Sequence, residues 1–210
     1  LSNSLESANV SIATSGDNAN IYINAAVSWS AATQLSLSAG DSIYINAPVS
    51  ASNSNGKLKL LYGQTAGSGE YYVNAPVNLA AGNNFFTQLG SNVADLKSYQ
   101  VITSLGSRAS TTGTDLQGIN GGLTANYALG ADIDASATQT WHNKVNHDGF
   151  TKIGTNDVTA NTETFYSGTF AGLGHTVSDL YMYQPNIGVS GMFAGLSSTG
   201  VIRDTGLVNM

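Results

Sequence analysis

The chain has 210 residues with 7 basic and 13 acidic side chains, a formal net charge of −6 and no cysteine. The basic residues are scattered, which argues against a nucleic-acid partner, because such a partner requires a basic stripe. The absence of cysteine excludes disulfide bonds and thiolate metal sites, and it fits a secreted bacterial protein. No apolar run approaches the roughly 20 residues needed to span a bilayer, so we expect a protein that is not inserted in a membrane.

A seven-residue phrase occurs three times, as IYINAAV at 21–27, IYINAPV at 43–49 and YYVNAPV at 71–77. The copies are separated by steps of 22 (21 to 43) and 28 (43 to 71) residues, and a shorter strand-like phrase precedes each of them. Recurrence at such steps is typical of a solenoid, in which each repeat forms one coil. Apolar residues alternate within the phrase, which predicts strands with one buried face.

Stacking of the coils in register places equivalent side chains above one another at about 4.8 Å. Two outward columns are predicted, one of tyrosines (Tyr22, Tyr44 and Tyr72) and one of asparagines that bond to each other (Asn24, Asn46 and Asn74). The tyrosines are interpreted as a structural ladder or, alternatively, as a glycan-binding strip. Pro48 and Pro76 predict corners, because proline cannot donate to a ladder. The step of 28 residues is longer than the step of 22, and the additional residues predict a loop at 63–70. Trp29 is interpreted as a cover for the end of the core.

The phrase is lost in the middle of the chain. YQVIT at 99–103 predicts a strand, and a capping Thr or Ser ahead of Asp115 predicts one or two turns of helix within 111–121. We expect this helix to lie against the side of the solenoid; a linker between two domains is the competing interpretation.

The C-terminal third uses different phrases. NYALGADIDAS at 126–136 predicts a strand interrupted by Gly130, and FAGL recurs at 170–173 and 193–196. That step of 23 residues (170 to 193) predicts one further coil. The sequence starts at Leu1, which is not an initiator Met, and it ends without a polar cap, so we expect a piece of a longer chain with more coils following.

These phrases carry a family resemblance. FAGLGHTVSDLYM at 170–182, SGMFAGL at 190–196 and VIRDTGLVN at 201–209 resemble the GLUG-type repeat of bacterial surface adhesins and immunoglobulin-A-protease-like passengers. DLQGINGGLTANYALGADIDAS at 115–136, together with the coil phrases, resembles two-partner-secretion exoproteins related to filamentous haemagglutinin. The resemblance covers most of the chain, and 81–110 is the poorest match.

The resemblance implies an all-β fold, a right-handed parallel β-helix (solenoid) with a short lateral helix and side loops. We expect one β-helix segment over 1–210, with regular coils in 1–80, an irregular stretch with the short helix in 81–125 and GLUG-like coils in 126–210. The family motifs are structural glycines and apolar core residues, so no enzymatic activity and no cofactor are expected.

The function implied is that of a structural and adhesive segment of a large secreted exoprotein. The implied partners are a receptor on host cells, other bacteria or matrix, including glycans, and the outer-membrane transporter that exports the parent chain to the cell surface. Two alternatives stay open. The chain could form the shaft of a contact-dependent inhibition or cytolysin exoprotein, or a polysaccharide-active β-helix enzyme.

The segment 141–150, WHNKVNHDGF, departs from the family phrase, and we interpret it as the contact loop of this member. Its candidate ligand-binding residues are Trp141, His142, Lys144, His147 and Asp148. The tryptophan offers a stacking surface for sugar rings. The two histidines with the aspartate could ligate zinc if the loop folds back, but histidines in a solvent-exposed loop are the alternative.

Asp132 and Asp134 flank one strand residue, so both carboxylates are predicted to face outward about 7 Å apart. With nearby carbonyls they are calcium candidates, although the nonapeptide repeat of calcium-binding β-rolls is absent and an ordinary polar turn is the alternative. Together with Asp179 and Arg203 they are the candidates for glycosidase or lyase chemistry. His175 is expected to pack at the start of a strand.

Overall fold

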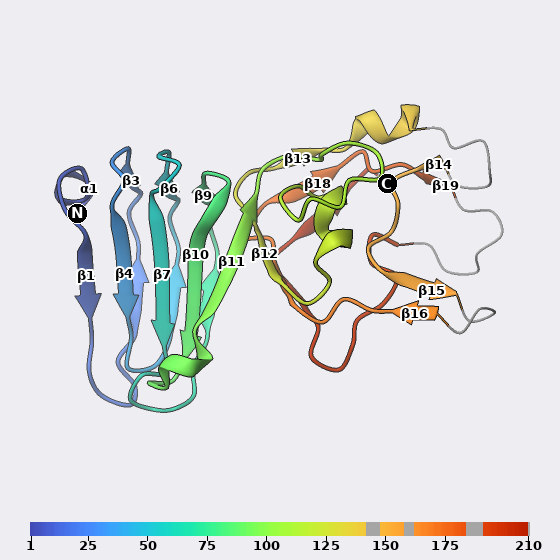
Figure 1. Ribbon diagram of the computed structural model, residues 1–210. Helices are drawn as coiled ribbons and strands as arrows, with labels where there is room; N and C mark the ends of the chain where they lie inside the picture. The colour runs from blue at the N-terminus through green and yellow to red at the C-terminus, as the bar shows by residue number, and fades with distance from the viewer. Residues whose placement is uncertain (142–147, 158–161, 184–190, 210) are drawn as a thin grey trace. The chain divides into compact units, whose positions relative to one another are not determined.

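The computed structural model describes residues 1–141, 148–157, 162–183 and 191–209. These residues form mostly β-strands with very little helix, which confirms the predicted all-β class (Figure 1). The chain divides into two compact units. The first consists of Leu1–Val101 with Ala128–Gly130, and the second consists of Ile102–Tyr127 with Ala131–Met210.

Parallel strand pairs in three sheets build most of the first unit. Two of the sheets take one strand from each copy of the seven-residue phrase, and the strands of the other include the shorter phrases. In Figure 1 the strands β1, β4, β7 and β10 run side by side in this order. They are β1 (Val10–Ala13), β4 (Gln34–Ser38), β7 (Lys57–Tyr62) and β10 (Gly82–Leu89). The second sheet contains β2 (Ile21–Ile23), β5 (Ile43–Ile45) and β8 (Tyr71–Val73), and the third contains β3 (Val27–Trp29), β6 (Val49–Ala51) and β9 (Val77–Leu79).

The register of these sheets follows the repeated phrase. Ile21 pairs with Ile43, and Ile43 pairs with Tyr71, so equivalent positions of the three copies lie directly over one another. Pro48 stands between β5 and β6, two strands that belong to different sheets, which confirms the predicted corner. The segment 63–70 connects β7 to β8 as the predicted loop.

The core of the first unit is a set of apolar columns. Leu35, Leu58 and Phe85 succeed one another on β4, β7 and β10, and all three are fully buried. Each such side chain stabilises the fold by about 1.5–3 kcal/mol relative to an exposed one. Trp29 is 3% exposed and donates its indole N–H to the carbonyl oxygen of Thr33 at 3.2 Å, as expected for a cover of the core.

A short helix, α1 (Ser2–Leu5), packs on the first coil next to β3. Leu5 is fully buried, and the hydroxyl of Thr33 donates to its carbonyl oxygen. The hydroxyl oxygen of Ser2 accepts from the backbone N–H of Ser28 at 3.0 Å, and the Glu6 carboxylate accepts from both the backbone N–H and the hydroxyl of Ser30. This helix was not predicted from the sequence, and it shields apolar side chains of the first coil from water.

The parallel stacking ends at β10, because the next strand reverses direction. β11 (Lys97–Ile102) pairs with β10 antiparallel, with Tyr99 opposite Phe85. This strand confirms the prediction at 99–103, with different boundaries. The hairpin between the strands contains the 3₁₀ turn η1 (Val93–Asp95), whose start is capped by the side chain of Asn92 accepting from the N–H of Ala94.

The second unit has shorter strands. In it β17 pairs with β20 in parallel, and β18 lies between β13 and β21 in a three-stranded parallel sheet. Two antiparallel pairs, β14 with β19 and β15 with β16, accompany them. The strands are β12 (Asn126–Leu129), which the unit boundary divides, β13 (Ile133–Asp134), β14 (Asp148–Gly149), β15 (Thr155–Asp157), β16 (Thr162–Thr164), β17 (Thr169–Ala171), β18 (Thr176–Ser178), β19 (Met182–Tyr183), β20 (Val201–Arg203) and β21 (Gly206–Val208).

The two FAGL phrases do not stack on one another, so the predicted step of 23 residues is wrong. Phe170 pairs with Ile202, whereas Phe193 forms an isolated bridge with Ile153. The rings of Phe170 and Phe193 instead meet edge to face with centroids 5.4 Å apart. Phe193 is only half-buried, and the strand β20 that pairs with β17 begins only at Val201.

The helix predicted within 111–121 is the 3₁₀ helix η2 (Gln117–Gly121), and its anchor differs from the one expected. The buried carboxylate of Asp115 accepts from the backbone N–H of Gly118 at 2.7 Å and from the hydroxyls of Ser110 and Thr112 at 2.8 Å. The aspartate therefore supports the turn, and the hydroxyl residues orient the aspartate. A second 3₁₀ helix, η3 (Ser136–Thr140), follows β13.

Candidate ligand-binding surfaces

The predicted tyrosine column is present on the outer face of β2, β5 and β8. The ring centroids of Tyr22 and Tyr44 lie 4.8 Å apart with planes 11° from parallel, and those of Tyr44 and Tyr72 lie 4.7 Å apart at 13°. Tyr22 and Tyr72 are 54% and 42% exposed. The stack is therefore a solvent-facing ladder with the spacing of the strands beneath it.

Stacking determines which part of each ring a ligand can reach. Both faces of the Tyr44 ring are covered by its neighbours, so only the ring edges and the hydroxyl are open along the middle of the ladder. Partial burial raises the pKa of Tyr44, as do the nearby Tyr72, Tyr22 and Asp41. Because sugars bind aromatic rings through the ring face, this geometry favours the structural interpretation of the ladder.

The asparagine column runs beside the tyrosines and is also confirmed. The side-chain amide of Asn46 donates to Asn24 at 2.8 Å, and that of Asn74 donates to Asn46 at 2.8 Å. All three residues are exposed. These hydrogen bonds between side-chain amides make it unfavourable for one coil to slip against the next. A shift of one residue would turn the asparagine side chains to the other face of the sheet and break the bonds.

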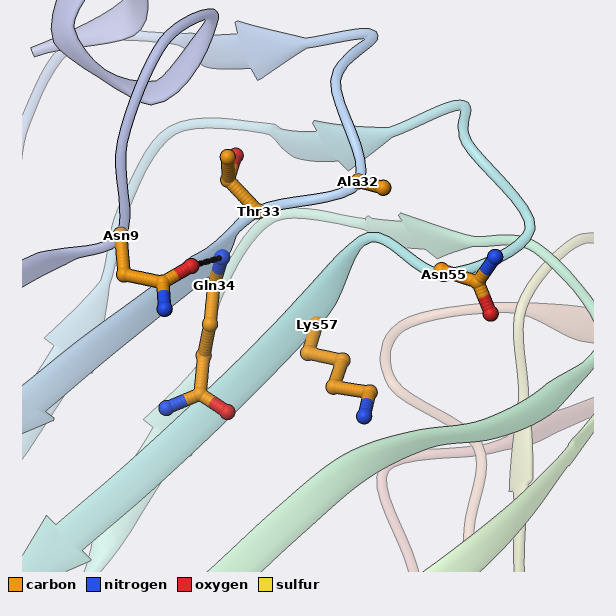
Figure 2. Close-up of a pocket in the computed structure, with 6 residues that line it drawn as sticks. All are labelled: Asn9, Ala32, Thr33, Gln34, Asn55 and Lys57. Carbon is orange, nitrogen blue, oxygen red and sulfur yellow. Dashed lines mark hydrogen bonds between the residues drawn. The ribbon is translucent and has the colours of Figure 1, made fainter.

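A polar hollow of about 410 Å³ opens at the corners that precede β1, β4 and β7 (Figure 2). It is lined by Asn9, Ala32, Thr33, Gln34, Asn55 and Lys57. Figure 2 shows the side chains of Gln34 and Lys57 extending from adjacent strands, and the side-chain oxygen of Asn9 accepting from the backbone N–H of Gln34 at 2.8 Å. None of the six lining residues is acidic, so Lys57 gives this hollow a net positive charge.

The contact loop predicted at 141–150 lies mostly outside the described residues. His142, Lys144 and His147 lie outside the described residues. Trp141 is half-buried at the end of η3, where its carbonyl oxygen accepts from Gly149 at 2.8 Å. Asp148 begins β14 and pairs through its backbone with Tyr183. The ligand-binding and zinc interpretations of this loop stay predictions.

Asp132 and His175 form a small polar cluster in the second unit. His175 is 4% exposed, immediately before β18, as predicted for a histidine that packs at the start of a strand. Its Nδ1 lies 3.3 Å from the Asp132 carboxylate, which also accepts from the backbone N–H of Thr176 at 2.8 Å. The hydrogen bond from the backbone N–H of Thr176 is the main cause that lowers the pKa of Asp132. Burial acts in the opposite direction, and the charge of His175 adds a smaller lowering effect.

The carboxylates proposed for calcium or for catalysis have separate partners. The hydroxyl of Ser136 and then its backbone N–H, which donates to Asp134 at 2.8 Å, lower the pKa of Asp134. Arg203 contacts Asp204 with Nε and Oδ2 2.6 Å apart. Asp179 has a left-handed backbone conformation and donates its N–H to Val208. Among the described residues, no three His, Cys, Asp or Glu side chains lie together as a metal site requires.

The hollow at Lys57 was not predicted, although a signal for it exists in the sequence. Asn9 precedes β1, and Gln34 and Lys57 begin β4 and β7, so each residue stands at the start of an equivalent phrase. The β4–β7 register pairs Gln34 directly with Lys57. Aligning the residues that flank the shorter phrases would have brought these three polar side chains together.

Comparison with known proteins finds one partial relative. The chain is similar to halomucin. The match to this protein of Haloquadratum walsbyi has 37% identity over 100 residues, covering 45% of this chain and 1% of the length of halomucin. The chain thus spans about one hundredth of the curated relative that it matches. No family model and no solved structure matches. Within the described residues, no helix has the length and apolar character needed to cross a membrane.

Proposed function

We propose that this chain is a right-handed parallel β-helix segment of a large secreted surface exoprotein, in which it has a structural and adhesive role. The proposal follows the resemblance to two-partner-secretion exoproteins of the filamentous haemagglutinin type. Its partners are then a receptor on host cells, other bacteria or matrix, and the outer-membrane transporter of the parent chain.

One observation carries the structural part of this proposal. The strands of the three copies of the phrase pair in parallel and in register in two sheets, and the shorter phrases do the same in a third. In such stacks each coil contacts only its neighbours, and length is gained by adding coils. A segment of this kind suits an extended surface protein.

The adhesive part is supported by the exposed surface and by the similarity to halomucin. Exposed columns of tyrosine and asparagine and a polar hollow with one lysine offer periodic contacts along the stacked coils. The large difference in length between this chain and halomucin fits a segment of a much longer protein.

The test is a bead-adhesion assay with the purified chain. Fluorescent beads coated with the chain are incubated with cultured epithelial cells, bacterial cells and immobilised matrix proteins, and bound beads are counted. Beads coated with a Leu35→Asp/Leu58→Asp variant are the control, because two buried charges prevent the coils from stacking. We expect binding of the native chain well above this control on at least one surface. Equal counts on all surfaces would contradict the adhesive role.

A further inference from the structure

The polar hollow at Lys57 is built by stacking, since successive coils contribute equivalent positions. Val10 pairs with Leu35, which places the preceding Asn9 beside Gln34, and Gln34 pairs with Lys57. The three side chains therefore form a short polar column along the start of β1, β4 and β7. Thr33, with its hydroxyl turned to the carbonyl oxygen of Leu5, forms part of the adjoining wall.

The charge of this column is not balanced by the protein. Among the described residues, the Lys57 ammonium has no hydrogen bond and no ion pair, and no acidic residue lines the hollow. The Glu6 carboxylate is held by Ser30. In a chain of net charge −6, an unpaired ammonium in a recess is a specific place for an anionic group. A bond from an ammonium to a carboxylate is roughly twice as strong as a bond between neutral groups.

The neutral lining residues have hydrogen-bonding capacity left for hydroxyl groups. The side-chain oxygen of Asn9 accepts from Gln34, which leaves its NH₂ group as a donor. The side-chain NH₂ of Gln34 donates to Ser36 at 2.8 Å, which leaves its oxygen as an acceptor. Asn55 adds a further side-chain amide at the rim. Sugar hydroxyls, which both donate and accept, fit such a mixture of amide donors and acceptors.

The size of the hollow limits what it can hold. Its volume of about 410 Å³ is at the low end of the range of roughly 300–1,000 Å³ found for small-molecule sites. A single sugar residue fits this volume, and the chain of a longer glycan can continue outside it. Because the lining contains no aromatic ring, recognition depends on the ammonium and the amides.

We propose that this hollow binds one carboxylate-bearing sugar residue, a uronic acid within a glycan, with Lys57 contacting the carboxylate and Asn9, Gln34 and Asn55 contacting the hydroxyls. The inference rests on the proposed adhesive function and names the chemical class of its ligand. It assigns ligand contact to the regular coils and not to the loop that begins at Trp141.

The experiment measures binding of oligogalacturonate to the full chain by isothermal titration calorimetry, at low and at physiological salt. Neutral galactose oligosaccharides of the same length and sodium acetate are the comparison ligands. Lys57→Gln removes the charge at the site. Lys59→Gln is the matched control, because it removes the same charge from the same strand two residues further on, outside the hollow. Circular dichroism verifies that both variants are folded.

We expect oligogalacturonate to bind at least tenfold more tightly than the neutral oligosaccharide, with acetate binding more weakly still. Lys57→Gln should lower the affinity at least tenfold, and Lys59→Gln should change it less than twofold. Equal losses in the two variants would show diffuse attraction to the strand and overturn the site. Equal binding of the neutral sugar or of acetate, or no binding of oligogalacturonate, would also overturn it. The bead assay decides separately whether the chain adheres at all.

Discussion

The tyrosine ladder gives a quantitative prediction, because its middle ring has two stacking partners and each end ring has one. Aromatic pairs contribute about 0.5–1.5 kcal/mol beyond the area that they bury. Tyr44→Ala removes two contacts with centroids 4.8 and 4.7 Å apart, so we expect the free energy of unfolding to fall by about 1–3 kcal/mol. Tyr22→Ala removes one contact and should cost about half as much.

The assay is urea unfolding of the full chain, followed by near-ultraviolet circular dichroism of the tyrosines. With a urea dependence of roughly 2 kcal/mol per molar, Tyr44→Ala lowers the midpoint by about 1 M. Tyr44→Phe is the control: it keeps the ring and the stacking, so its midpoint should stay close to that of the native chain. Equal losses for Tyr44→Ala and Tyr22→Ala would refute the reasoning, because they would show that stacking does not contribute to the effect.

Three further predictions concern the core, a close backbone approach and acid stability. Leu37→Ala deletes a fully buried side chain of β4 and should cost about 2–5 kcal/mol in urea unfolding, whereas Ser36→Ala on the outer face of the same strand should stay within about 0.5 kcal/mol. Gly40→Ala places a Cβ 2.2 Å from the carbonyl oxygen of Gly16, so we expect a loss of about 1–3 kcal/mol and a lower thermal midpoint. Asp132 has a lowered pKa in the folded protein. Its carboxylate therefore stabilises the fold above its unfolded pKa of about 3.9, and this stabilisation is lost as the pH falls through its pKa in the folded protein. The urea midpoint of Asp132→Asn should therefore fall less between pH 5 and pH 2 than that of the native chain.

Each of these three has an outcome that would contradict it. Similar losses for Leu37→Ala and Ser36→Ala would mean that β4 does not have one buried and one exposed face. An unchanged thermal midpoint for Gly40→Ala would show that the two corners are not in contact. An identical pH dependence of Asp132→Asn and the native chain would show that the hydrogen bond from Thr176 does not stabilise the charged carboxylate.

The repeated phrase was sufficient to predict the parallel strands of the first unit and their register. Alternation with period two assigns a face to every side chain, and the constant phrase fixes the register, so the columns at Tyr44 and Asn46 followed from the sequence. The corner at Pro48 followed as well, because proline removes a donor that a strand requires. Such features depend on residues close in sequence or repeated at a fixed step. The loop that begins at Trp141 is the part of the predicted site that stays untested.

The tertiary structure decided what the repeats do not encode. Two features involve segments without a copy of the phrase: the packing of Leu5 on the first coil and the reversal of chain direction at β11. No repeat in the sequence therefore predicts them. The prediction that the two FAGL phrases stack on one another failed for the same reason, because similar phrases do not specify which strands pair. The hollow around Lys57 exists because the corners before β1, β4 and β7 lie in succession, each one strand spacing from the next. The sequence by itself thus determined the strands and their register, and only the folded chain determined which surfaces those coils share.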